Sequence, residues 1–223
     1  MTAYVLVHGG NVSTETWNRL TVGSQVHTPD GRLGGRVWDL VVPDLVAAGT
    51  RTFSPTLGDE HHADLTDHID QICSIISDAD LRDVVLVGHS YGGMVITGVA
   101  ARHPGPVTGL VYVDAALPVP GQSLFDIISE GGVDPLSIAG LEAAPPYVEK
   151  LDFAWSAGRS ISKTYLMCTA SDFAFVTKVA ETKIGTGLVG ENWRILRLPS
   201  GHLPMAEMPQ RLSQVLLTTG VYD

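Results

Sequence analysis

Short runs of β-branched and apolar residues alternate along the chain with segments whose apolar residues recur at helical spacing. Such runs are typical of strands that are buried on both faces of a sheet. The alternation predicts an α/β protein, with a mostly parallel sheet of about six strands and helices on both faces. The predicted strands are Ala3–His8, Thr50–Phe53, Val84–Gly88, Leu110–Asp114, Lys163–Cys168 and Arg194–Leu198.

Four segments between and after these strands have the pattern of helices. Apolar residues at steps of three and four mark amphipathic helices over Trp38–Ala48 and Leu65–Ile76. Gly92–Arg102 is rich in small residues, so this helix can approach the sheet closely, and Pro104 follows its end. The last predicted helix covers Pro209–Leu217.

Two segments interrupt the alternation within what we expect to be a single domain over residues 1–223. Residues 118–162 contain five prolines and no strand pattern, and we interpret them as a small, mostly helical cap. Residues 21–37 carry two β-rich arms around Thr28-Pro29-Asp30-Gly31, which predicts either a hairpin with a tight turn or a surface loop. We expect this segment to lie beside the loop that follows the first strand.

The balance of charges narrows the possible partners. The 223 residues carry a formal net charge of −10. Such a surface repels phosphate backbones and anionic lipid heads, so neither nucleic acid nor membrane is an expected partner. The chain has no basic and apolar secretory signal at its start, which predicts a cytoplasmic protein. The two cysteines, Cys73 and Cys168, fall inside a helical and a strand pattern, and we expect both to be reduced thiols.

The strongest chemical signal is the sequence Gly88-His89-Ser90-Tyr91-Gly92, which follows a β-branched strand and precedes a helix. A serine at such a sharp strand-to-helix turn is held in a strained backbone conformation that exposes its hydroxyl. The start of the next helix directs free N–H groups and the positive end of its dipole toward an anion. We therefore predict Ser90 as a nucleophile.

The first strand ends in a second glycine-rich turn, His8-Gly9-Gly10. Ester hydrolysis passes through a tetrahedral oxyanion that requires preorganised N–H donors. We expect the backbone N–H groups of Gly10 and Tyr91 to supply them. His8 is expected to hold this loop by side-chain hydrogen bonds rather than to take part in the chemistry.

A serine nucleophile needs a histidine base, and a carboxylate must orient that histidine. His202 lies in a turn after the last strand, which places it at the edge of the sheet where Ser90 is expected. His89 should point away from the serine. For the acid we favour Asp172, four residues beyond the fifth strand, and Asp114 at the end of the fourth strand is the alternative.

A metal site is the competing interpretation of His61, Asp64 and His68, which share one helix face. Imidazole and carboxylate ligands suit zinc or iron. We instead interpret these residues as the solvated end of the predicted helix over Leu65–Ile76, and we expect neither metal nor cofactor.

Together these motifs resemble the α/β-hydrolase superfamily over nearly the whole chain. The motifs are YVLVHGG, GHSYGG, the ASD turn at 170–172 and the SGH turn at 200–202. The segments VYVDAALPVPGQS and GHLPMAEMPQRL are similar to those of one branch of the superfamily, whose members have a small cap. This branch includes plant methylesterases, hydroxynitrile lyases and bacterial carboxylesterases. The resemblance implies a triad of Ser90, Asp172 and His202, and a sheet that lacks the first two superfamily strands.

The chain departs from the lyases of that branch at two positions. Lyases carry a lysine after the triad histidine and a threonine in the glycine loop, where this chain has Leu203 and Gly9. Cyanohydrin cleavage is therefore not expected. The resemblance favours a serine hydrolase that cleaves a small or medium apolar ester or lactone through an acyl-enzyme. Alternatives are a lyase, an acyl transferase, a pathway-specific lactone step, or a ligand-binding receptor.

The predicted pocket walls come from the cap. The apolar side chains expected to line it are Leu117, Leu124, Phe125, Ile127, Ile128 and Trp155.

Overall fold

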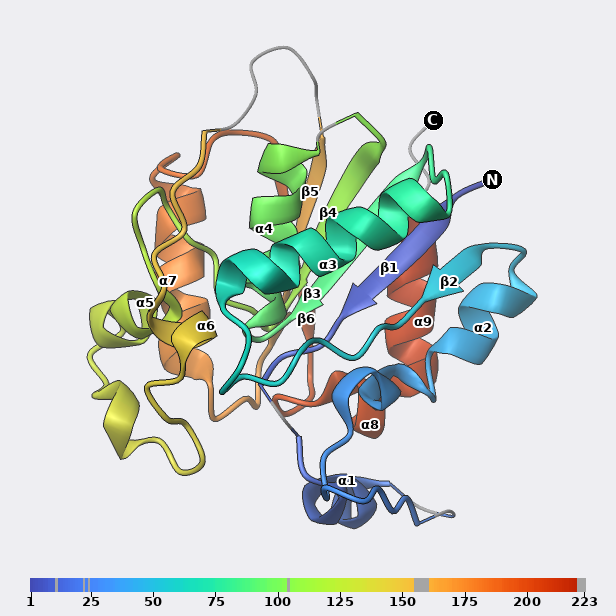
Figure 1. The fold of residues 1–223 in the computed structure, drawn as a ribbon, viewed down its shortest axis with the longest axis horizontal. Coiled ribbons are helices and arrows are strands. Elements are labelled where there is room, and N and C mark those ends of the chain that lie inside the picture. Colours follow the sequence, from blue (N-terminus) through green and yellow to red (C-terminus); the bar gives the residue numbers. More distant parts are fainter. Residues whose placement is uncertain (11, 22, 24, 104, 155–160, 220–223) are drawn as a thin grey trace.

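A computed structural model describes the chain except for residues 11, 22, 24, 104, 155–160 and 220–223. Its centre is a six-stranded parallel sheet with the strand order β2-β1-β3-β4-β5-β6 (Figure 1). The strands are β1 (Ala3–Val7), β2 (Arg51–Phe53), β3 (Val84–His89), β4 (Val107–Val113), β5 (Ser162–Cys168) and β6 (Trp193–Leu198). All six predicted strands are confirmed, and so is the α/β class.

Helices cover both faces of the sheet. One face packs against α3 (Leu65–Asp78), α4 (Gly92–Arg102) and α7 (Ala174–Gly185). The other packs against α2 (Val42–Ala47), α8 (Pro204–Glu207) and α9 (Pro209–Thr219). Because both faces are covered, every residue of β1 and β3 is buried, which explains their continuous apolar runs. Among the described residues, no helix has the length and apolar character needed to span a membrane.

The predicted helix over Trp38–Ala48 is shorter than expected. A 3₁₀ helix, η1 (Gly34–Trp38), precedes α2, which begins at Val42 with Pro43 in its first turn. Proline is tolerated in the first turn of a helix because the N–H group at that position has no partner within the helix. This explains why α2 does not extend back to Trp38.

The region inserted between β4 and β5 forms short helices separated by loops. These are α5 (Leu124–Glu130), a 3₁₀ turn η2 (Pro135–Ser137) and α6 (Pro145–Val148). Figure 1 shows them grouped beside α7. The cap is joined to the body through Glu149, whose carboxylate accepts hydrogen bonds from the backbone N–H and the hydroxyl of Thr66 in α3.

Of the two alternatives predicted for residues 21–37, a hairpin or a surface loop, the hairpin is not the structure that forms. Its second arm becomes η1, and residues 31–33 pair with residues 12–14 instead, through an antiparallel bridge between Ser13 and Arg32. Gly35 explains the change, since a Cβ there would lie 2.1 Å from the carbonyl oxygen of Ser54. The backbone at Gly35 packs closely against the backbone of residues 54–55, in place of the hydrogen-bonded ladder of a hairpin. Val22, in the first predicted arm, lies outside the described residues.

The position predicted for this segment is confirmed. Leu33 donates its N–H to the carbonyl of Val12, so the segment lies beside the residues that follow the glycine turn after β1. Together with α1 (Thr14–Leu20), it projects from the carboxyl ends of the strands (Figure 1). Parallel α/β sheets bind their ligands at this edge.

Candidate active site

Ser90 lies at the sharp turn between β3 and α4 and has a positive φ of 54°. This conformation is strained for a residue with a side chain, and such strain is typical of functional turns. The glycines on either side allow the turn to form. A Cβ on Gly88 would lie 2.5 Å from the carbonyl oxygen of Gly92, and a Cβ on Gly92 would lie 2.6 Å from that of Val7.

The glycine turn after β1 packs against the turn that carries Ser90. A Cβ on Gly9 would lie 2.6 Å from the Cβ of Ser90, so only glycine fits there. Gly10 and Tyr91 both line the pocket that contains Ser90. The adjacent His8 is buried, accepts a hydrogen bond from the N–H of Leu57 at Nε2 and donates from Nδ1 to the carbonyl of Gly9. His8 therefore holds the loop, as expected.

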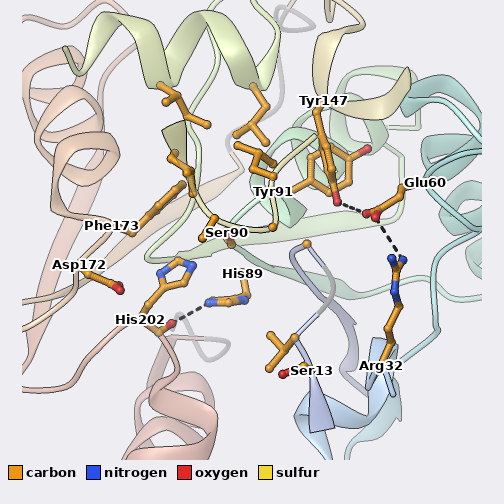
Figure 2. A pocket seen from close by; sticks show the side chains of 18 of the residues that line it. Ser13, Arg32, Glu60, His89, Ser90, Tyr91, Tyr147, Asp172, Phe173 and His202 are labelled. Atoms are coloured by element: carbon orange, nitrogen blue, oxygen red, sulfur yellow. Dashed lines mark hydrogen bonds and ion pairs between the residues drawn. The ribbon is translucent and has the colours of Figure 1, made fainter. Parts of the chain in front are cut away.

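His202 lies in the turn between β6 and α8 and faces the same pocket. Figure 2 shows its imidazole beside Ser90. The ring lies between the rings of Phe173 and His89, with a centroid separation of 4.6 Å on each side. The turn itself is held by Glu207, which accepts the N–H of Gly201 at 2.8 Å.

Asp114 is the carboxylate that binds His202. Its Oδ2 lies 2.7 Å from Nδ1 of His202, and its side chain is fully buried at the end of β4. The same carboxylate accepts hydrogen bonds from the hydroxyl of Ser171 at 2.5 Å and the N–H of Cys168 at 3.1 Å. A buried charge needs such partners. Asp114 also has a positive φ of 46°, a second strained position in this site.

The expectation that Asp172 orients His202 is therefore wrong, and the alternative, Asp114, holds that position. Asp172 is exposed and lines the outer part of the pocket. Asp172 would orient His202 only if the His202 turn stayed beside the loop that follows β5. The turn carrying His202 instead crosses the ends of β5 and β4 and reaches β3, where His89 donates Nε2–H to the carbonyl of His202 at 2.8 Å. The ASD turn at 170–172 instead contributes Ser171, whose hydroxyl donates a hydrogen bond to the Asp114 carboxylate.

His89, the histidine next to Ser90, is buried, and its side chain is directed toward the His202 turn. Burial lowers the pKa of His89 well below its ordinary value, and the nearby His202 adds to that effect. Burial likewise lowers the pKa of His8 to about 4. Both rings are therefore neutral at neutral pH, and His202 is the histidine left facing the nucleophile.

The residues considered as metal ligands have other partners. Asp64 caps α3, where its side chain accepts the N–H of Asp67. His68 is buried, contrary to the solvated position that we expected, and Nδ1 accepts from the hydroxyl of Tyr91 while Nε2 donates to the carbonyl of Gly58. Within the described part of the chain, no three His, Cys, Asp or Glu side chains are grouped to hold a metal ion. The two cysteines, both described, are free.

The pocket has a volume of about 580 Å³ and two unlike sides. Leu124 and Ile128 of the cap contribute to an apolar wall, as predicted. Leu117, Phe125 and Ile127 do not line the pocket, and Trp155 lies outside the described residues. Other apolar residues of this wall, which sequence reasoning missed, are Ile138, Leu141, Phe173 and Phe175.

The opposite side of the pocket is polar. The hydroxyl of Tyr147 donates to Oε2 of Glu60 at 2.6 Å, and Arg32 pairs with Oε1 of Glu60 at 3.1 Å. Figure 2 shows this chain of contacts across the pocket from Asp172 and His202. Tyr147 lies in the short helix α6, whereas Arg32 and Glu60 lie in two separate loops. The three residues share no motif, so no signal in the sequence pointed to their meeting.

Comparisons with known proteins identify the family and support the fold. The model of the alpha/beta hydrolase family matches residues 4–182. The carbendazim hydrolyzing esterase of Nocardioides sp. (strain SG-4G) is 28% identical over 84% of this chain and 95% of its own length. An extracellular alpha/beta-hydrolase from a Paenibacillus species, described as homologous to tobacco salicylic acid binding protein 2, superposes with a TM-score of 0.73 at 19% identity, covering both chains fully.

A pyrethroid hydrolase from Sphingobium faniae JZ-2 also has a similar fold. Its TM-score is 0.67 at 19% identity, over 98% of this chain and 97% of its own. The resemblance inferred from the motifs is confirmed by these matches. The structural neighbours bear on the fold alone, because their sequences have diverged too far to carry over a substrate.

Proposed function

Because the chain belongs to the alpha/beta hydrolase family, we propose that it is a serine carboxylesterase that cleaves a small or medium apolar ester or lactone. The observation that carries the proposal is one pocket holding a strained serine and a histidine whose Nδ1 is bound by a buried aspartate. This is the arrangement that activates a weak hydroxyl nucleophile. The esterase name of the Nocardioides relative supports the same reaction class.

In the proposed mechanism, Nε2 of His202 takes the proton of Ser90 as Oγ bonds to the acyl carbon. The carbonyl oxygen becomes an oxyanion, which the N–H groups of Gly10 and Tyr91 stabilise. The imidazolium then returns its proton to the leaving alcohol, and the C–O bond breaks. Water, deprotonated by the same histidine, releases the acid and restores Ser90. Asp114 stabilises the imidazolium in both steps.

The size of the pocket supports the proposed range of substrates. A cavity of about 580 Å³ lies within the usual range for small-molecule sites. Its apolar wall of cap and α7 residues suits an apolar acyl or alcohol group.

The test is hydrolysis of short 4-nitrophenyl esters together with labelling by a fluorophosphonate. We expect turnover and a single covalent adduct on Ser90, and we expect Ser90→Ala to lose both. Ser77, exposed near the end of α3, provides the matched serine control. Undiminished turnover in Ser90→Ala, or an unlabelled protein without esterase activity, would contradict the proposal.

A further inference from the structure

The hydroxyl of Tyr147 borders the place where the scissile carbonyl would bind. A Cβ added to Gly10 would lie 3.3 Å from this oxygen, so the phenol stands next to the backbone N–H proposed to hold the oxyanion. The tyrosine ring is buried and packs edge-on against Tyr91, with 5.1 Å between ring centroids. Its oxygen is therefore held at a defined point on the pocket wall.

The hydroxyl hydrogen of Tyr147 is already engaged in a hydrogen bond within the protein. It is donated to Glu60 at 2.6 Å, and a carboxylate accepts hydrogen bonds but donates none. Arg32 pairs with the other oxygen of Glu60, and the Glu60 side chain is only 14% exposed. Burial and the neighbouring carboxylate both raise the pKa of Tyr147, so the phenol keeps its proton. Only the lone pairs of the phenol oxygen remain for a ligand.

We infer that the site selects esters bearing an O–H or N–H group one or two bonds from the scissile carbonyl carbon, with Tyr147 accepting that hydrogen. Tyr147 is then a specificity-determining residue, and Glu60 and Arg32 are positioning residues. The inference rests on the proposed esterase function. An aryl-substituted 2-hydroxy ester suits both sides of the pocket, because its ring would lie against Leu124 and Phe173.

The test compares methyl mandelate with methyl 2-methoxy-2-phenylacetate, which lacks the donor, and with methyl 2-phenylpropanoate, which is closer in size. The readout is the ratio of kcat/KM for the hydroxy ester to that for each analogue, in wild type and in Tyr147→Phe. Dividing the two ratios removes the intrinsic reactivities of the esters. We expect the wild-type ratio to exceed that of Tyr147→Phe by about tenfold, the size of one hydrogen bond.

Two further variants make the result decisive. Glu60→Gln places an amide that can donate to the phenol oxygen, so the preference should fall while the tyrosine remains. Tyr4→Phe removes another buried phenol hydroxyl, one that donates to the carbonyl of Leu216 far from the pocket, and its ratio should match wild type.

Equal ratios in wild type and a folded Tyr147→Phe, with all three esters hydrolysed, would overturn this inference and leave the esterase proposal standing. If Tyr147→Phe does not fold, an unchanged ratio in Glu60→Gln would overturn it instead. Failure to hydrolyse these esters and 4-nitrophenyl acetate would overturn both proposals.

Discussion

At the scale of single residues, the site depends on where one carboxylate is buried. Asp114 and Asp172 each follow a strand, and each preserves the chain order of serine, acid and histidine. Only Asp114 is enclosed, with His202, Ser171 and the N–H of Cys168 as its donors. A fully buried carboxylate with three donors orients an imidazole far better than an exposed one, because water does not compete for it.

Replacing Asp114 should therefore affect catalysis much more than replacing Asp172. We expect Asp114→Asn to lower kcat for 4-nitrophenyl esters by about 10⁴-fold, because a neutral amide does not stabilise the imidazolium and its NH2 group favours the wrong tautomer of the ring. Asp172→Asn, the matched control, should stay within about threefold of wild type. Thermal unfolding of both variants separates lost chemistry from lost folding. A larger loss in Asp172→Asn than in Asp114→Asn would contradict the assignment of Asp114.

At the scale of elements, the cap is held to the body by contacts that cross between helices. Lys183 of α7 is buried at 2% exposure and donates to the carbonyl of Leu117 and to Oε1 of Gln122, at 3.1 and 2.7 Å. It also pairs with Glu130 at the end of α5. Burial lowers the pKa of this ammonium group, and the pairing with Glu130 opposes that effect. Lys183 thus links α7 to three residues in the first part of the cap region, between positions 117 and 130.

Removing this lysine should destabilise the protein. Lys183→Ala leaves a buried carbonyl without its donor and opens a cavity, so we expect the free energy of unfolding to fall by about 3 kcal/mol. Urea denaturation provides the measurement. Lys178→Ala on the same helix, where the side chain is exposed, should change it by less than about 0.5 kcal/mol. Equal effects would show that the Lys183 contacts are energetically unimportant.

At the scale of the whole molecule, buried histidines link folding to pH. His8, His68 and His89 are all buried, and burial lowers the pKa of each. For His8 the folded pKa is about 4, against an ordinary value of 6.5. Between these values the unfolded chain binds a proton that the folded protein does not, so acid favours unfolding.

We therefore expect the free energy of unfolding to fall as pH decreases from about 6.5 to about 4.5. Each such histidine contributes at most about 1.4 kcal/mol per pH unit. Urea denaturation across this range measures the slope, and His8→Asn should reduce it because one titrating group is removed. Stability that is constant or rises on acidification would contradict the assignment of neutral buried rings.

The sequence by itself determined the strands, the fold class, the sharp turn that carries Ser90 and the place of His202 after the last strand. These depend on local properties: β-branched runs buried on both faces, glycines where a Cβ would collide, and a histidine at the carboxyl edge of a parallel sheet. The same local reasoning did not identify the 3₁₀ helix that replaces the hairpin arm considered at Leu33–Val37, where packing against residues 54–56 outweighed the strand pattern.

Only the tertiary structure decided which aspartate orients His202 and which residues form the polar wall. Those choices depend on how one loop crosses the ends of its neighbouring strands, and on the contacts that Glu60 makes with Tyr147 of α6 and with Arg32 of another loop. Neither is encoded in residue spacing, because loop paths are set by side-chain packing between segments distant along the chain.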